Sequence, residues 1–121
     1  RITVGGIGLG GRGSSDLGCF LRQPDVQFVA VCDVRATRRK AVKQMVDKCY
    51  GNQDCKLYRD MHEILARPDI DAMLIATGDR WHAPASIMAM RAGKDVFCEK
   101  PSCHTMAQGQ IVVETARRFA R

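Results

Sequence analysis

The residues best suited to chemistry are a group of glycines near the start of the sequence and one acidic residue that follows them. The glycines form the pattern Gly8-Leu-Gly10-Gly-Arg-Gly13, and Asp33 lies twenty residues after the last of them. Between a strand and a helix, the first such glycine permits a tight turn, the second lets the backbone approach a pyrophosphate, and the third allows close packing. A carboxylate that ends the next strand accepts hydrogen bonds from a ribose hydroxyl. The pattern therefore predicts a dinucleotide pocket.

The segments on either side of the glycines have the patterns that such a pocket requires. Residues 2–7 are expected to form a short buried strand, and residues 11–22 a helix that ends before Pro24. The free N–H groups and the positive end of that helix would face the phosphates. We therefore place Gly11 and Arg12 among the cofactor-binding residues.

A second register of the glycine motif is available, because Gly6, Gly8 and Gly11 have the same spacing. We prefer the register that begins at Gly8, since Gly6 then stays inside the strand. The preferred register also keeps the spacing between Gly13 and Asp33 near twenty residues, as is typical of this pocket.

Asp33 also bears on the choice of cofactor. It lies at the end of the apolar run over 28–32, and its carboxylate favours NAD because it would repel the 2′-phosphate of NADP. Arg35 and Arg38 follow it and could reach such a phosphate. We therefore expect NAD, with NADP possible, and include Arg35 in the site.

After Asp33 the sequence alternates between helix and strand patterns without a linker or a repeat. The expected elements are a helix over 37–49, a strand over 56–58, a helix over 61–66, a strand over 71–76, a helix over 81–92, a strand over 95–98 and a helix over 106–119. This alternation predicts an α/β fold with a doubly wound parallel sheet of the Rossmann type. Right-handed connections give the strand order 3-2-1-4-5.

Ligands of such sheets bind outside the carboxyl ends of the strands, at the point where the strand order reverses. That point falls between the first and fourth strands. Besides the glycine turn, two segments meet there, and they add the candidates Thr77, Trp81, His82, Glu99 and Lys100.

Length and composition are those of one domain over residues 1–121, with 45% apolar residues and a net charge of +6. The basic residues of the helix over 37–49 have the spacing of a solvated face and lack interleaved aromatics, so nucleic acid is not expected as a partner. No run of eighteen apolar residues is present, so no membrane span is expected. We expect a cytoplasmic location, with a periplasmic one after removal of a leader as the alternative.

The six cysteines contain no CxxC pair, and no metal site is expected. Cys19 and Cys32 occupy apolar positions and are expected to be buried. Cys49 and Cys55 flank a polar loop in which a disulfide is conceivable, but the required Cα separation cannot be obtained from sequence.

The segments GLGGRG, VAVCDV, LIATGDRWH and AGKDVFCEKP, in this order, resemble the N-terminal half of the Gfo/Idh/MocA oxidoreductases over nearly the whole chain. The resemblance implies a domain that binds NAD or NADP. It also implies a C-terminal substrate domain, absent from this chain, that supplies much of a homo-oligomer interface. The substrates would be small molecules, in most cases a sugar or polyol oxidised or reduced at a hydroxyl carbon.

The same resemblance implies roles for single residues. Lys100, the lysine of the EKP element, would be the catalytic residue beside the nicotinamide, where an ammonium group stabilises negative charge that develops on oxygen. Glu99 would orient Lys100. His82 would lie near the nicotinamide or be structural, and Trp81 would form an apolar wall or simply pack.

The sequence leaves three functions open. We favour an oxidoreductase that transfers a hydride between a sugar or polyol and nicotinamide. The alternatives are an NAD-dependent glycosidase of the same family and a non-catalytic dinucleotide-binding module. In the first two cases the 121-residue chain alone is expected to bind cofactor without turnover.

Overall fold

A computed structural model describes residues 2–8, 11–33, 35–77, 79–99 and 106–119. Five parallel strands form one sheet in the order β3-β2-β1-β4-β5, which confirms the predicted topology. The strands are β1 (Ile2–Ile7), β2 (Val26–Cys32), β3 (Lys56–Tyr58), β4 (Ala72–Ile75) and β5 (Asp95–Cys98). The helices are α1 (Gly11–Leu21), α2 (Ala36–Tyr50), α3 (Met61–Leu65), α4 (Asp79–Arg91) and α5 (Met106–Phe119).

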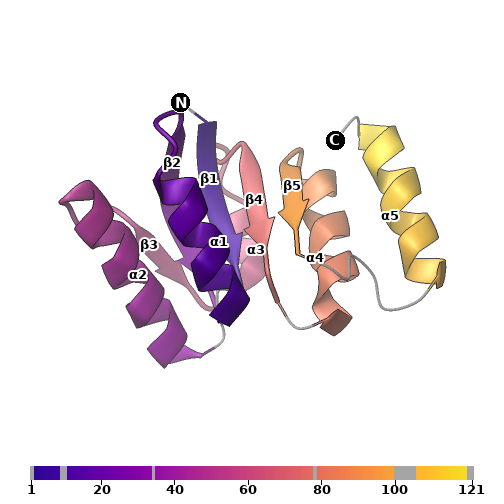
Figure 1. Cartoon of the computed structure of the whole chain (residues 1–121). Coiled ribbons are helices and arrows are strands. Elements are labelled where there is room, and N and C mark those ends of the chain that lie inside the picture. The colour runs from indigo at the N-terminus through magenta and orange to yellow at the C-terminus, as the bar shows by residue number, and fades with distance from the viewer. Residues whose placement is uncertain (1, 9–10, 34, 78, 100–105, 120–121) are drawn as a thin grey trace.

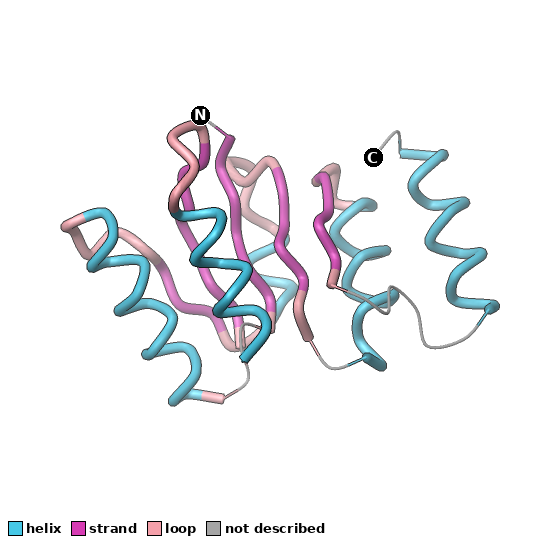
Figure 2. The backbone as a smooth tube through the Cα atoms, in the orientation of Figure 1, coloured by secondary structure: helices cyan, strands magenta, loops and turns pink. Residues whose placement is uncertain are grey.

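The helices cover the two faces of the sheet (Figure 1; Figure 2). Helices α1 and α2 lie on the near face in these views, and α3 and α4 lie behind it. Helix α5 runs beside α4. Each face has its own apolar core, with Phe28, Leu17 and Val46 on the first side and Ile75, Ile64 and Ala85 on the second. Because both faces are covered, the inner strands β2 and β4 are nearly continuous apolar runs.

Two helices begin earlier than the sequence predicted. Helix α2 starts at Ala36 rather than at 37. Helix α4 starts at Asp79 rather than at 81, and its sixth residue is Pro84. Proline at this position removes one hydrogen bond of the helix, because only the first four N–H groups lack partners within it.

The pairing of β1 with β2 is irregular at one place. Val4 lies opposite Phe28, but the next residue, Gly5, lies opposite Ala30, so that Val29 is an extra residue on β2. Val29 and Ala30 both belong to the core beneath α3 and α4, whereas Phe28 belongs to the other core. This is the pattern of a β-bulge.

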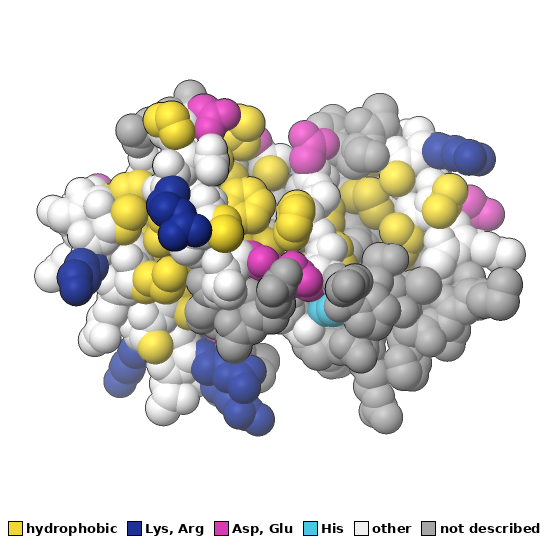
Figure 3. Space-filling view, viewed as in Figure 1, with side chains coloured by type: hydrophobic (Ala, Val, Ile, Leu, Met, Phe, Trp, Pro, Cys, Tyr) yellow, Lys and Arg dark blue, Asp and Glu magenta, His cyan; other side chains and the backbone are white. Residues whose placement is uncertain are grey.

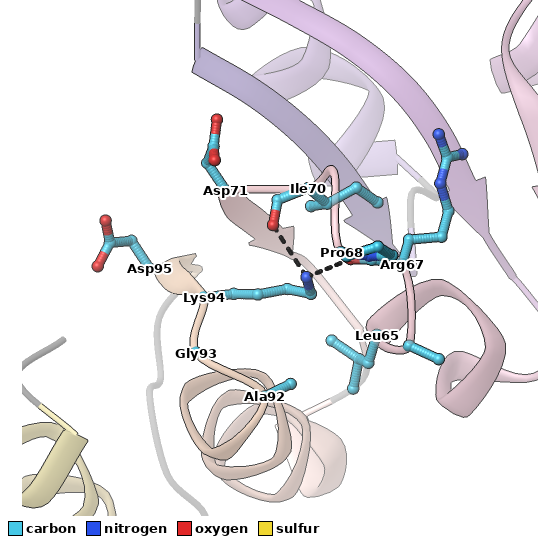
Figure 4. Close-up of a pocket in the computed structure, with 10 residues that line it drawn as sticks. Leu65, Arg67, Pro68, Ile70, Asp71, Ala92, Gly93, Lys94 and Asp95 are labelled. Atoms are coloured by element: carbon cyan, nitrogen blue, oxygen red, sulfur yellow. Dashed lines mark hydrogen bonds between the residues drawn. The ribbon is translucent and has the colours of Figure 1, made fainter.

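At the amino edge of the sheet, a buried lysine joins two loops. The Lys94 ammonium donates to the carbonyl oxygens of Arg67 at 2.7 Å and Ile70 at 2.9 Å, and only 3% of the residue is exposed (Figure 4). It lines a pocket of about 470 Å³, where burial lowers its pKa. In the same view the carboxylates of Asp71 and Asp95 point away from the ammonium. We interpret Lys94 as a structural clamp between the segments that precede β4 and β5.

The cysteines differ from expectation at one position. Cys19 is exposed, because the buried stripe of α1 runs through Leu17 and Leu21, and Cys19 lies on the opposite side of the helix. Cys32 is buried as predicted. Cys49 and Cys55 are free thiols and form no disulfide.

Burial also predicts which thiols react. Burial raises the pKa of Cys32 to about 12 and that of Cys55 to about 11, whereas Cys19 and Cys49 are exposed. Because the thiolate is the nucleophile, iodoacetamide at neutral pH should modify Cys19 and Cys49 and spare the other two until the protein unfolds. Peptide mapping by mass spectrometry measures this directly. Modification of Cys32 as fast as Cys19 would show that β2 opens.

Candidate cofactor site

Three candidate residues, Gly8, Asp33 and Glu99, lie at the carboxyl edge of the sheet together with Ala76, which precedes the candidate Thr77. Each follows the end of a strand, and its backbone N–H continues the ladder onto the neighbouring strand. The donors Gly8, Asp33, Ala76 and Glu99 bond the carbonyls of Cys32, Tyr58, Ile7 and Ile75 at 2.9, 3.1, 3.0 and 2.9 Å, respectively. The convergence predicted from sequence is therefore present in the backbone, because parallel strands that end at one edge bring the residues after them together.

Gly8 makes the turn that leaves β1. Its φ is +71°, a conformation that favours glycine, and a Cβ there would come within 2.6 Å of Thr77 Cα and Cγ2. The turn after β1 thus lies directly against the loop after β4. Gly6 is buried inside β1, so the backbone favours the register that begins at Gly8.

The backbone of α1 begins at Gly11, directly after the glycine turn, and includes Gly13 in its first turn. The start of α1 therefore lies at the carboxyl edge, where the N–H groups of a helix N-terminus can bind an anion.

Asp33 provides the test of whether a dinucleotide fits. Only 8% of the residue is exposed, and its Oδ1 accepts a hydrogen bond of 2.9 Å from the Arg35 amide. Its Oδ2 is buried and has no hydrogen-bond partner among the described residues. A buried carboxylate oxygen without a donor is unfavourable, and a ribose hydroxyl is a donor of the right kind. The residues of this edge therefore fit the ribose of a dinucleotide.

His82 holds the loop after β4 in place. It is 2% exposed, and its Nε2–H donates to the carbonyl of Thr77 at 2.7 Å. Ser86 in turn donates to the His82 carbonyl at 2.7 Å. Because Thr77 also contacts the Gly8 turn, His82 positions the surface that this turn packs against. This is the structural role that the sequence left open; contact with the nicotinamide stays a prediction.

The remaining predicted residues are placed only in part. Glu99 is half-buried at the end of β5, and Arg35 is exposed at the start of α2. The side chains of Arg12 and Trp81 lie outside what the structure describes, as do Gly10 and Lys100 altogether. Their roles stay predictions.

Sequence reasoning missed Arg39. Its guanidinium Nη1 donates to the backbone carbonyl of Asp33 at 2.7 Å. On the face viewed in Figure 3, Lys and Arg side chains gather at the lower edge beside the start of α2. Among the arginines of this segment, the sequence pointed to Arg35 and Arg38 by proximity to Asp33, but both are exposed. The available signal was the position of Arg39 one helical turn after Arg35, which directs a side chain back over the preceding turn.

Comparison with known proteins agrees with this geometry. Residues 2–120 match the family described as an oxidoreductase family with an NAD-binding Rossmann fold. The chain belongs to the Gfo/Idh/MocA family. In this family setting, the Gly8 turn and Asp33 are parts of an NAD-binding Rossmann domain.

Individual relatives are similar over almost the whole chain. A glycosyl hydrolase family 109 protein from Saccharopolyspora erythraea is 36% identical over 99% of this chain, which spans 27% of that relative. A probable dehydrogenase from Thermotoga maritima has a TM-score of 0.87 and 29% identity over 98% of the chain and 34% of its own. A 3-ketoreductase from Actinomadura kijaniata in complex with NADP has a TM-score of 0.85 and 25% identity over 98% of the chain and 35% of its own.

The chain thus spans about a quarter of the curated relative and about a third of these solved structures. Within the described ranges, no group of three or more His, Cys, Asp or Glu side chains is arranged to hold a metal ion. None of the helices described is long and apolar enough to cross a membrane.

Proposed function

We propose that this chain is the cofactor domain of an oxidoreductase that transfers a hydride between nicotinamide and a hydroxyl carbon of a sugar or polyol. The observation that carries the proposal is Asp33, whose buried Oδ2 lacks a donor beside the glycine turn at the carboxyl edge of the sheet. Family membership supports the redox chemistry. The 3-ketoreductase among the similar structures supports a carbonyl or hydroxyl carbon as the reacting centre.

Different residues of the chain would bind different parts of the dinucleotide. The backbone at Gly8 and the N-terminus of α1 would hold the pyrophosphate, and Asp33 would accept from the ribose hydroxyls. When bound, the nicotinamide supplies the hydride acceptor or donor. Lys100, which follows Glu99, would stabilise negative charge on the substrate oxygen. His82 keeps the loop after β4 against the glycine turn and so preserves the shape of the pocket.

Asp33→Ser should weaken NAD binding by about tenfold and strengthen NADP binding. The substitution removes the acceptor for the ribose hydroxyls and also the negative charge that repels a 2′-phosphate. Titration calorimetry with each cofactor measures both constants. Asp54→Ser is the matched control, because it removes the same charge from an exposed loop and should leave both affinities unchanged. Tighter NADP than NAD binding by the unchanged protein would contradict the assignment of NAD.

A glycosidase is the second candidate, because relatives at 36–37% identity carry the name glycosyl hydrolase family 109 protein. The full-length protein separates the two in one pair of assays. Net NADH formation from NAD and a polyol supports the dehydrogenase. Aglycone release from a glycoside with no net NADH overturns it in favour of the glycosidase. Cofactor binding with neither reaction leaves the non-catalytic module.

A further inference from the structure

The turn between β2 and α2 is held together by Arg39, through its backbone and its side chain. The Arg39 amide donates to the Arg35 carbonyl at 3.1 Å, which is a hydrogen bond at the start of α2. Its guanidinium reaches back to the Asp33 carbonyl at 2.7 Å. One residue therefore fixes both ends of the turn that carries the ribose-binding carboxylate.

The contacts of Asp33 show what this arrangement accomplishes. The Asp33 amide is tied to Tyr58 of β3, its carbonyl to Arg39, and its Oδ1 to the Arg35 amide. Its Oδ2 has no partner within the described part of the chain. The Arg39 guanidinium thus holds the Asp33 carbonyl, while the buried Oδ2 of the same residue has no donor among the described residues.

The other two arginines of the turn are placed differently. Arg35 and Arg38 are exposed, whereas Arg39 is partly buried. The Arg35 contribution to Asp33 is its backbone N–H, which any residue except proline would supply. The contact with Asp33 therefore depends on the side chain at Arg39 but not on the side chain at Arg35.

We propose that Arg39 is a positioning residue that sets the preference for NAD over NADP by holding the Asp33 carboxylate in its binding orientation. The inference rests on the proposed function, because it concerns the same ribose site. A fixed orientation of the Asp33 carboxylate increases the affinity for NAD, because the 2′-hydroxyl of NAD can donate a hydrogen bond to it. NADP carries a phosphate at that position, gains nothing from the alignment and is repelled by the fixed charge.

The test is the ratio of the two dissociation constants in Arg39→Met, measured by calorimetry with NAD and with NADP. We expect NAD affinity to fall by about tenfold while NADP affinity stays within twofold or improves. The preference for NAD over NADP should therefore decrease. Arg39→Lys should restore part of the preference, because an ammonium can donate to the same carbonyl. Lys48→Met is the control: it removes an equal charge from an exposed position at the far end of the same helix and should leave the ratio of the two dissociation constants unchanged.

Several results would overturn the proposal. An equal loss of both affinities would make Arg39 merely structural, and a greater loss for NADP would make it a direct ligand of the 2′-phosphate. An unchanged ratio of dissociation constants in a folded Arg39→Met variant, or an equal change of that ratio in Lys48→Met, would also refute it. If the unchanged protein binds neither cofactor, the proposed function fails, and the inference fails with it. If it binds NAD but Arg39→Met shows no shift, only the inference fails.

Discussion

Gly8→Ala is expected to lower the free energy of unfolding by roughly 2–4 kcal/mol and to weaken dinucleotide binding by at least about tenfold. Two separate costs combine at this position. The φ of +71° strains any residue with a side chain, and the new Cβ would lie 2.6 Å from the Thr77 backbone, which cannot move aside as a flexible side chain can. Relief of the contact would separate the glycine turn from the loop after β4. Urea unfolding and NAD titration measure the two effects.

Gly51 is a matched control for this experiment. It has the same φ of +71°, but a Cβ there would meet nothing within 4 Å. Gly51→Ala should therefore cost only the conformational strain, about 1 kcal/mol, and leave NAD affinity unchanged. The difference between the two variants isolates the contact with Thr77. Equal losses of stability in both would mean that the contact contributes nothing.

Lys94→Met is expected to lower the free energy of unfolding by roughly 2–4 kcal/mol. The substitution keeps most of the apolar stem but leaves the carbonyls of Arg67 and Ile70 without the donor that now binds both. Because the clamp lies at the amino edge, opposite the cofactor site, NAD affinity in the folded variant should stay within twofold. Denaturant unfolding and calorimetry provide the two readings.

Lys48→Met removes the same charge from an exposed position in α2 and is the control. It should change stability by less than about 0.5 kcal/mol. A Lys94→Met variant as stable as this control would show that water replaces the ammonium at no cost. A large loss of NAD affinity in Lys94→Met would instead show that the two edges of the sheet are coupled.

The features predicted correctly from sequence are those that local chemistry determines. The glycine turn, the alternation of strands with helices and the acid at the end of β2 all follow from residue type and spacing, and together they specify the topology. The strand order needed no tertiary information, because right-handed crossovers leave few alternatives. The meeting of the Gly8 turn with the loop at Thr77 followed from that order.

The features that were missed depend on where side chains point in the folded chain. The sequence left a structural role for His82 open, and only the direction of its ring, which bonds the Thr77 carbonyl, shows that role. Arg39 was one of several basic residues on a helix, and only its direction distinguishes it from Arg38. Cys19 was expected to be buried because it falls at an apolar helix position, but the buried side of α1, which contains Leu17, faces away from it.

Because β2 contains an extra residue, the number of residues between the glycines and Asp33 does not by itself determine where Asp33 lies in the sheet. Val29 lengthens the strand by one residue, yet Ile7 still pairs with Cys32, and Asp33 still follows directly after that pair. Loss of Val29 would restore a regular ladder with Phe28 and Ala30 on the faces they already occupy. A related sequence with an interval of nineteen residues in place of twenty would thus deliver its carboxylate to the same place. Searches for this pocket should therefore look for an acid directly after the end of the second strand. They should let the number of residues between the last glycine and the acid vary by one.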